Sequence, residues 1–382
     1  MDWGRQFRVR VPVHDEALWN SPAVKDSLVR ALKMLTGDEW NFTFVQTAKP
    51  QSGPVQSHFG FPEDVDTVIP FSDGLDSRAV STVIERTRSE KMIRVRVGSK
   101  KISRPGPGEP IQPFANVPFK VRRIKSGNGE SSGRSRGFKF AMLSGIAAYL
   151  VGADRIIVPE SGQGALGPVL VSLGQSCLDR RTHPQYTSLM SEFFEALFET
   201  RIQFEHPVLW NTKGESLAAY KALVEGDDIW KETRSCWKDA RHASVNGDHR
   251  QCGICAACML RRTSLHAAGY AEAPSMYIWE DLSASDFWAG THKDHHDKSP
   301  AQRDYAVAGV LHMDHIAALA NAENREVLVQ RQALILARTL GVSFQDCDRR
   351  ITQLIEKHAD EWRSFVGSLS KSSFVRDWAL AA

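Results

Sequence analysis

The sequence lacks a long apolar run, and it has no marked excess of charge of either sign. Among its 382 residues, 48 Lys and Arg are nearly balanced by 45 Asp and Glu, which argues against a nucleic acid as a direct partner. The most apolar stretch, residues 141–153, is interrupted by Ser144, Gly145 and Gly152, so we expect a buried helix there and no membrane span. The first residues contain no apolar segment typical of a signal peptide. We therefore expect a cytoplasmic globular protein.

Cysteine is also scarce, and most of it lies in one place. The sequence has 6 Cys, and in a cytoplasmic chain such residues are more often metal ligands or buried thiols than disulfides. Two-residue gaps let neighbouring thiolates reach one tetrahedral zinc ion. Three cysteines have this spacing and a fourth lies upstream, which makes the predicted ligands Cys236, Cys252, Cys255 and Cys258. A closed site of this kind stabilises the fold and leaves no open position for catalysis.

Two alternatives to a four-thiolate zinc site stay open. An iron–sulfur cluster also uses closely spaced cysteines. His242 or His249, which lie between Cys236 and Cys252, could replace Cys236 as the fourth ligand.

What the sequence does contain is a signal for a strand, a polar loop and a helix at residues 67–77. Backbone N–H groups in such a loop point together at the positive end of the helix dipole, which binds phosphate. The loop has no Lys, unlike the Walker pattern, and this suits cleavage between the α- and β-phosphates of ATP. An ordinary helix cap is the alternative. The predicted ATP-binding residues are Ser72, Asp73, Gly74, Leu75, Asp76 and Ser77.

The rest of the chain predicts an α/β fold with a parallel sheet. A helix over residues 77–91 and a strand over residues 92–97 complete a β-loop-α-β unit. Further strands are predicted at residues 7–13, 117–124 and 155–158, and further helices at residues 21–35, 138–151 and 186–200. Glu160, at the end of a strand and before a Gly-rich turn, is placed to recognise N–H groups of a ligand. Thr212 and Glu215 form a capping-box pattern.

The loop pattern Ser72-x-Gly74-x-Asp76-Ser77 resembles the S-G-G-x-D-S loop of the PP-loop ATP pyrophosphatases. That superfamily converts a carboxylate or carbonyl into its adenylate and releases pyrophosphate. Asp73 replaces the second Gly of the pattern, so its charge either points away from the phosphates or helps to hold Mg²⁺. Pro70 removes a hydrogen-bond donor from what should be a central strand.

The cysteine segment is similar to that of the QueC family, the 7-cyano-7-deazaguanine synthases, and the similarity runs in order from about residue 66 to residue 268. The resemblance implies a Rossmann-like parallel sheet, ATP, Mg²⁺ and Zn²⁺ as cofactors, and adenylation of 7-carboxy-7-deazaguanine. Ammonia then gives the amide, and a second activation gives the nitrile. It implies catalytic roles for Asp76, Ser77 and Arg136. It also implies that Gln185 and Lys213 contact the substrate, as Glu160 is expected to do.

Several departures separate the chain from that family. Gln185 stands where QueC has the Asp that would read the deazaguanine edge, and Gly137 stands where it has Asn. The regions before and after the similar part are additional. Together these features resemble the QueC-like members of anti-phage operons, of the Qat type or of type IV CBASS. That resemblance implies transfer of the activated deazaguanine to an amine on a partner protein, or a reaction that stops at the amide; a homodimer is possible.

The chain is predicted to have three regions. These are an accessory N-terminal layer on the main sheet (residues 1–65), a QueC-like ATPase domain with the zinc site (66–274) and a helical C-terminal extension (275–382). Helices are predicted in the extension at residues 302–320, 324–340 and 353–368. Its aromatic residues, among them Trp362 and Trp378, either pack internally or form a docking surface for a partner, and internal packing is the preferred interpretation.

Two other functions fit parts of the pattern. A tRNA-modifying enzyme of the same superfamily would need a reactive Cys and a basic RNA-binding surface. A non-enzymatic scaffold in a defence complex would bind nucleotide without turning it over.

Overall fold

The structure is a computed structural model, and it describes most of the chain. The described residues are 4–48, 61–62, 64–72, 74–97, 113–115, 117, 134–171, 178–224, 226, 229–238 and 243–379. They fall into two compact units. The first is drawn from Met1–Ser72, Ile84–Pro159 and Cys177–Pro207, and the second from Asp73–Val83, Glu160–Ser176 and Val208–Ala382.

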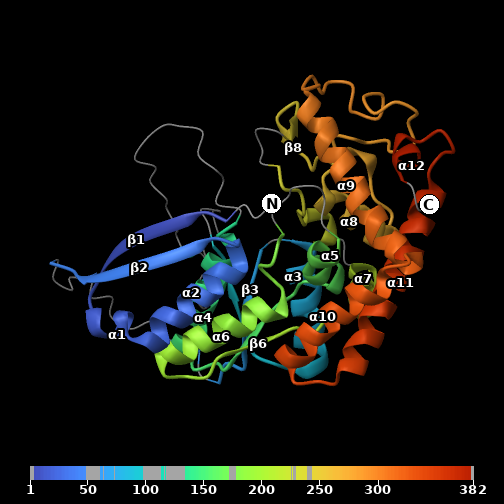
Figure 1. Cartoon of the computed structure of the whole chain (residues 1–382). Coiled ribbons are helices and arrows are strands. Elements are labelled where there is room, and N and C mark those ends of the chain that lie inside the picture. Colours follow the sequence, from blue (N-terminus) through green and yellow to red (C-terminus); the bar gives the residue numbers. More distant parts are fainter. Residues whose placement is uncertain are drawn as a thin grey trace. The chain divides into compact units, whose positions relative to one another are not determined.

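The first unit contains the main sheet, and its elements are shown in Figure 1. Its strands are β1 (Gln6–Val13), β2 (Glu39–Gln46), β3 (Thr67–Pro70), β4 (Met92–Val95), β5 (Arg155–Ile157) and β6 (Gln203–Glu205). Its helices are α1 (Glu16–Asn20), α2 (Pro22–Thr36), α4 (Arg136–Val151) and α6 (Pro184–Phe198). Helix α3 (Leu75–Arg88) begins in the second unit and ends in the first.

The main sheet is parallel, with the strand order β4-β3-β5-β6. The predicted β-loop-α-β unit is therefore confirmed, and so is the mixed α/β class. Pro70 is tolerated because it is the last residue of β3: its partner in the register is Val95 of β4, whereas β5 pairs only with Thr67 and Val68. Most of the predicted strand at residues 117–124 lies outside the described residues.

The sequence predicted that the N-terminal residues form a layer on the main sheet. They form a small sheet of their own instead. Strands β1 and β2 make a separate two-stranded parallel sheet, whose eight-residue register runs from Gln6 with Glu39 to Val13 with Gln46. Helix α2 covers this small sheet and packs mainly against α6. Helices α4 and α6 in turn pack on the main sheet. The small region is thus attached through helices, because its apolar residues join the core built by α4 and α6.

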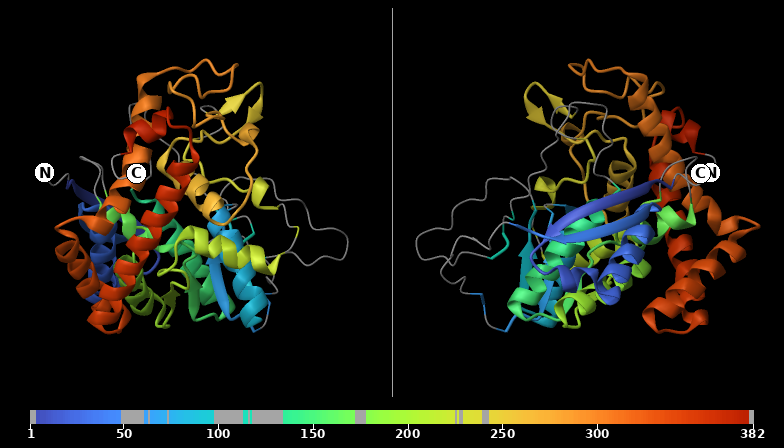
Figure 2. Two further views of the ribbon diagram at one scale, coloured as in Figure 1. Left: turned by 90° about the vertical axis from the view of Figure 1, so that its right-hand side faces the viewer. Right: turned by 60° about the vertical axis from the view of Figure 1, so that its left-hand side comes forward.

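The second unit is mostly helical. Its helices are α5 (Gly162–Leu170), α7 (Lys213–Leu223), α8 (Ala256–Ala267), α9 (Pro300–Ala318), α10 (Arg325–Leu340), α11 (Phe344–Ser368) and α12 (Phe374–Trp378). It also has 3-10 turns at Ile229–Glu232, Pro274–Met276 and Leu319–Asn321, and a hairpin of β7 (Ser244–Val245) and β8 (Asp248–His249). Helices α9, α10 and α11, orange to red, lie together in both views of Figure 2.

Two details of the second unit correct the sequence analysis. The Gly-rich stretch after Glu160 was predicted to be a loop turn, but it forms the start of helix α5. Gly162 N–H donates to the Asn211 carbonyl oxygen at 3.0 Å. Glycine is needed at this position because a side chain there would collide with the Leu209 carbonyl oxygen. Helix α11 begins nine residues before residue 353, at Phe344, because the Ser343 side chain caps it by accepting from Asp346 N–H.

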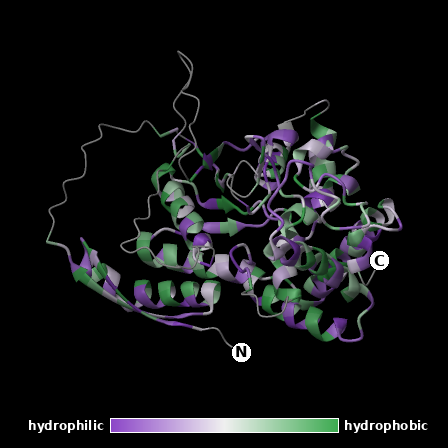
Figure 3. Ribbon diagram, turned by 90° about the horizontal axis from the view of Figure 1, so that it is seen from above, coloured by the Kyte–Doolittle hydropathy of each residue, from purple (hydrophilic) through white to green (hydrophobic). Residues whose placement is uncertain are grey.

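The C-terminal helices share cores with the rest of the second unit. Trp362, Phe365 and Phe374 are buried with residues of α8 and α9 in one cluster, and Trp378 packs against it. The interpretation of these aromatics as internal packing is confirmed. Both units show hydrophilic and hydrophobic residues along the same helices (Figure 3), as amphipathic helices require. Within the described part of the chain, no helix combines the length and hydrophobicity needed to cross a bilayer. The predicted region boundaries near residues 65 and 274 stay a prediction.

Candidate functional site

The predicted phosphate loop leads into the first turn of α3. Leu75 is buried against Leu217 and Leu265, which anchors the start of this helix in the second unit. The buried Ser77 hydroxyl donates to the Gly74 carbonyl oxygen at 3.2 Å and closes the turn. The first N–H groups of an α-helix have no helical partners, so this end of α3 has the geometry that binds anions. Ser72 belongs to the first unit, and Asp73 lies outside the described residues.

Lys213 supplies the positive charge that the loop itself lacks. It is the first residue of α7, its side chain is only 6% exposed, and its Nζ lies 2.7 Å from Asp76 Oδ2 in the first turn of α3. Burial alone would lower the pKa of Lys213, but the charges of Asp76 and Glu160 outweigh it and raise the pKa above its ordinary value. The lysine is therefore an ammonium at neutral pH. The sequence predicts Lys213 only as a substrate residue, and nothing in it indicates the pairing with the loop.

Glu160 also belongs to the second unit and lies between the end of β5 and the start of α5. Its carboxylate acts electrostatically on Lys213. Gly164, in the first turn of α5, has no room for a side chain, because an added Cβ would collide with the Glu160 carboxylate. The structure thus brings together one ammonium and two carboxylates, Asp76 and Glu160, beside a helix N-terminus. This is a donor set that can hold a polyphosphate and a divalent cation at once.

The other two predicted site residues lie in the first unit. Arg136 is exposed at the first position of α4. Gly137 follows it because an added Cβ would collide with Arg181 and crowd Leu35, which explains why Asn is absent there. Gln185 is half-buried in the first turn of α6.

A half-buried histidine that carries no sequence signal contacts the first turn of α6. The His206 ring Nε2 is 2.8 Å from Thr187 Oγ1, and burial together with the nearby His183 lowers the pKa of His206 to about 3. Burial also raises the pKa of the fully buried Tyr186 phenol. Both side chains are neutral at physiological pH. Tyr186 belongs to the His-Pro-Gln-Tyr segment at the start of α6, whereas His206 directly follows β6.

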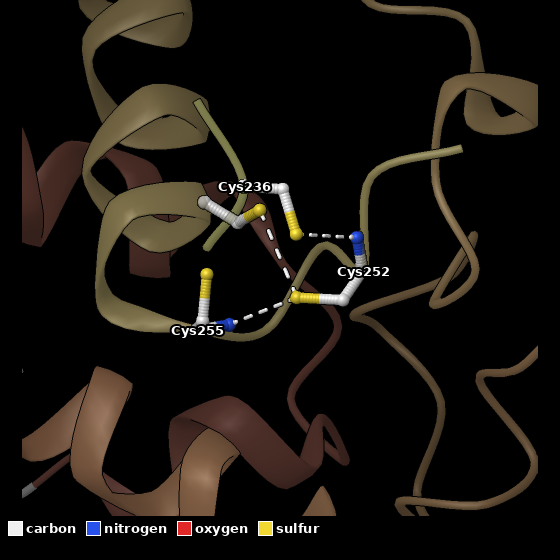
Figure 4. Close-up of side chains that lie close together, drawn as sticks. Cys236, Cys252 and Cys255 are labelled. Atoms are coloured by element: carbon white, nitrogen blue, oxygen red, sulfur yellow. Dashed lines mark hydrogen bonds between the residues drawn. The ribbon is translucent and has the colours of Figure 1, made fainter. Parts of the chain in front are cut away.

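The four predicted cysteines converge in the second unit. All four sulfur atoms lie within 4.8 Å of one another, and Cys252 Sγ is 3.8 Å from Cys258 Sγ. Thiolates bound at about 2.3 Å to one tetrahedral zinc ion would lie about 3.8 Å apart. The sulfurs of Cys236, Cys252 and Cys255 point toward a common centre in Figure 4. This spacing fits a single metal ion, and His249 is not part of the group.

Local hydrogen bonds prepare these sulfurs for a cation. Cys236 Sγ accepts from the N–H groups of Cys252 at 3.2 Å and of Lys238 at 3.4 Å, and Cys252 Sγ accepts from Cys255 N–H at 3.4 Å. Hydrogen bonds from the neighbouring cysteines lower the pKa of the Cys236 thiol, whereas burial raises the pKa of the Cys258 thiol. A bound cation would make the thiolate form favourable for all four.

The backbone around the cysteines explains why they meet. Gly253 has φ +86°, a conformation that other residues avoid, and it turns the chain between Cys252 and Cys255. Cys255 is the N-cap of α8, so Cys258 falls in the first turn of that helix. Gly309 of α9 packs against the same loop, because an added Cβ would collide with the Ile254 carbonyl oxygen.

Arg261 fastens the cysteine segment from behind. It is completely buried in α8 and donates to Thr233 Oγ1 at 2.8 Å, to the Trp230 carbonyl oxygen at 3.2 Å and to the Tyr277 hydroxyl at 3.2 Å. Glu272 balances its charge at 3.6 Å. Arg261 therefore joins the chain before Cys236 to the chain after α8.

Comparison with known proteins supports the resemblance for one segment. A sequence model of the family described as "Queuosine biosynthesis protein QueC" matches residues 171–269, which is about a quarter of the chain. The matched segment includes Lys213 and the four cysteines, and it ends before α9. It does not include the phosphate loop or Glu160. No curated protein matches the chain.

Proposed function

We propose that the chain is a QueC-like, ATP-dependent enzyme of the PP-loop superfamily that activates a carboxylate as its adenylate. The observation that carries the proposal is the contact of 2.7 Å between Lys213 Nζ and Asp76 Oδ2. Lys213 lies in the segment that matches QueC, and Asp76 lies in a loop that the match does not cover. Two regions recognised by independent signals therefore meet in one charged site, as a nucleotide-activating enzyme requires.

The chemistry assigns a role to each side of this site. A carboxylate oxygen of the substrate attacks the α-phosphorus of ATP, the bond between the α- and β-phosphates breaks, and pyrophosphate leaves. Lys213 and the N-terminal N–H groups of α3 hold the departing negative charge. Asp76 and Glu160 supply the carboxylate oxygens that Mg²⁺ prefers. A nitrogen nucleophile then attacks the acyl carbon, and AMP leaves.

We propose 7-carboxy-7-deazaguanine as the substrate, because the QueC match supports that class. The assignments of Gln185 to the base and of Arg136 to the activated group rest on the resemblance to QueC alone. The nucleophile is ammonia or an amine of a partner protein in an anti-phage system, and the zinc held by the four cysteines would stabilise the second unit. Cys347, the described cysteine outside the cluster, is buried and its thiol pKa is raised, so it does not fit the reactive cysteine of a tRNA thiolase.

The test is a mass-spectrometric assay of the purified full chain. The protein is incubated with MgATP and 7-carboxy-7-deazaguanine, with and without ammonium, and both the small molecules and the protein masses are read. We expect AMP and pyrophosphate together with the amide or the nitrile. AMP that forms only when a protein encoded by a neighbouring gene is added, and a matching mass gain on that protein, would identify a protein amine as acceptor. The absence of AMP in every mixture would contradict the proposal.

A further inference from the structure

A hydrogen-bond network connects the C-terminal helix α11 to the charged site. The Glu361 carboxylate of α11 accepts from the Thr212 hydroxyl through Oε1 and from Gln163 Nε2, at 3.3 Å, through Oε2. Thr212 is the N-cap of α7, and Gln163 lies in the first turn of α5. Thr212 and Gln163 are both buried, so the donor side of each bond is shielded from water, and Glu361 is half-buried.

The network has a single consistent assignment of donors and acceptors. His358 Nε2 is 2.8 Å from the Met313 carbonyl oxygen, which can only accept, so this nitrogen carries the proton. His358 Nδ1 must then accept from Gln163 Nε2 at 2.8 Å. The Gln163 amide is thereby oriented with its Oε1 toward the backbone N–H of Lys213, at 2.8 Å.

The network ends at the residue that pairs with the phosphate loop. Gln163 holds the backbone of Lys213, and Thr212 caps the helix that Lys213 begins. The Lys213 ammonium then reaches Asp76. Gly214, the next residue, gives Glu361 its place, because an added Cβ there would collide with Glu361 Oε1. A change in α11 is therefore passed to Lys213 through two buried residues.

We propose that α11 is a positioning element of the nucleotide site, in which Glu361 and His358 act through Gln163 and Thr212 to hold Lys213 against Asp76. The nucleotide part of this inference rests on the proposed function. Helix α11 lies outside the residues that match QueC. The C-terminal region thus completes a site whose recognisable parts lie elsewhere in the chain.

The first arm of the test measures Lys213 without any nucleotide. An amine-acylating reagent is applied to the folded full-length protein, and modification of Lys213 is followed by peptide mass spectrometry. Its burial and its pairing with Asp76 make Lys213 slow to react in the wild type. Glu361→Leu leaves two buried donors unpaired, and we expect Lys213 to react about tenfold faster. Asp360→Leu, the adjacent change at a side chain that is 82% exposed, is the matched control and should leave the rate unchanged.

The second arm measures MgATP affinity in a double-mutant cycle. If Glu361 acts through Lys213, the double variant of Glu361→Leu and Lys213→Met binds MgATP no more weakly than Lys213→Met alone. Losses that multiply would show that Glu361 acts independently and would overturn the proposal. An unchanged Lys213 reaction rate in Glu361→Leu would overturn it as well.

Two further variants keep the test decisive. If Glu361→Leu does not fold, Gly214→Ala displaces the carboxylate while every network side chain is retained, and we expect the same faster reaction of Lys213. Glu361→Gln, which retains the shape and part of the hydrogen bonding, should restore most of the protection. A wild type that binds no MgATP would contradict the proposed function, whereas the reactivity of Lys213 would still decide whether α11 positions it.

Discussion

The cysteine centre and the charged site of Lys213 lie in the same compact unit, yet they are built in opposite ways. The four cysteines come from residues 236–258, a single stretch of chain, and their spacing alone predicts a metal site. The charged site takes Asp76 from α3, Glu160 from the segment between β5 and α5, and Lys213 from α7, and α11 supports it. A local site survives in a sequence pattern, whereas a dispersed site exists only when the chain is folded. Removing a member should therefore have different consequences in the two places.

The largest effect is expected at the cysteine centre. Cys255→Ser should abolish stoichiometric zinc binding and unfold much of the core shared by α8, α9 and α11, because structural zinc contributes about 10 kcal/mol or more to folding. Metal analysis and thermal denaturation measure this. Cys347→Ala, at a buried cysteine outside the centre, is the control and should retain full zinc content with a smaller loss of stability. Full zinc content in Cys255→Ser would contradict the predicted ligand set.

The next effect is expected at Arg261, where the two sites come close. Arg261 supports the cysteine segment through buried hydrogen bonds, and its charge also acts on Lys213. Arg261→Met leaves the Thr233 and Tyr277 oxygens without this donor and leaves the Glu272 carboxylate, which keeps the hydrogen bond from the Tyr277 hydroxyl, without its cation; this should cost about 3 to 5 kcal/mol of unfolding free energy. Denaturant unfolding measures it, with Arg376→Met in α12 as a control. A loss below about 1 kcal/mol would mean that the network is dispensable.

At the charged site we expect loss of activity without loss of the fold. Lys213→Met and Asp76→Asn should each lower the rate of AMP formation by about 100-fold, which is typical when one charge-stabilising group is removed. Zinc content should stay at the wild-type level in both, because neither residue touches the cysteines. Lys371→Met, at an exposed lysine, provides the control. Unchanged AMP formation in both variants would contradict the assignment of the site.

The smallest effect is a pH dependence of the folding stability, which arises from titratable residues of α11 and not from the cysteine centre. Burial raises the pKa of Glu361 to about 7 from 4.5. Between these values the folded protein binds more protons than the unfolded chain, so the contribution of Glu361 is present at low pH and is lost as the pH rises through 7. The charged groups that face it are Glu215 of α7 and Lys357 of α11.

His358 acts in the opposite sense over part of the same range. Burial lowers its pKa from 6.5 to about 4, so its contribution is gained as the pH rises between these values. Glu361→Gln removes only the first contribution. We expect its stability relative to the wild type to increase by about 2 kcal/mol between pH 4.5 and pH 7.5. Chemical denaturation at several pH values measures this, and a difference that does not change with pH would contradict the raised pKa.

The fold was predictable where local signals are strong. The capping box of Thr212 and Glu215 is present as predicted, with both reciprocal hydrogen bonds. The parallel sheet followed from the alternation of apolar strands and helices. The turn predicted after Glu160 was wrong. Glycine usually disfavours a helix, so the Gly-rich stretch did not indicate α5. The close approach of the Leu209 carbonyl oxygen explains why Gly162 is glycine, and this contact is visible only in the folded chain. The early start of α11 depended on one N-cap serine that the periodicity did not emphasise.

The candidate site was only partly predictable. Asp76 was named from the loop motif, Glu160 from its strand position and Lys213 from the resemblance to QueC, but nothing in their spacing indicates that they meet. Gln163, His358 and Glu361 carry no motif at all, and His358 looks like any histidine on a long helix. Gly137 and Gly214 are small for reasons that only their neighbours reveal, Arg181 in one case and Glu361 in the other.

By itself the sequence determined the strands and helices of the β-loop-α-β unit, the parallel sheet, the four-cysteine group and the loop that begins α3, because these depend on residues close together in the chain. Only the tertiary structure decided that the lysine absent from the loop is supplied by Lys213, and that α11 supports it. Hydrogen bonds and ion pairs between residues more than a hundred positions apart leave no periodicity or spacing in the sequence. They arise from the packing of α5, α7 and α11, which no local pattern specifies.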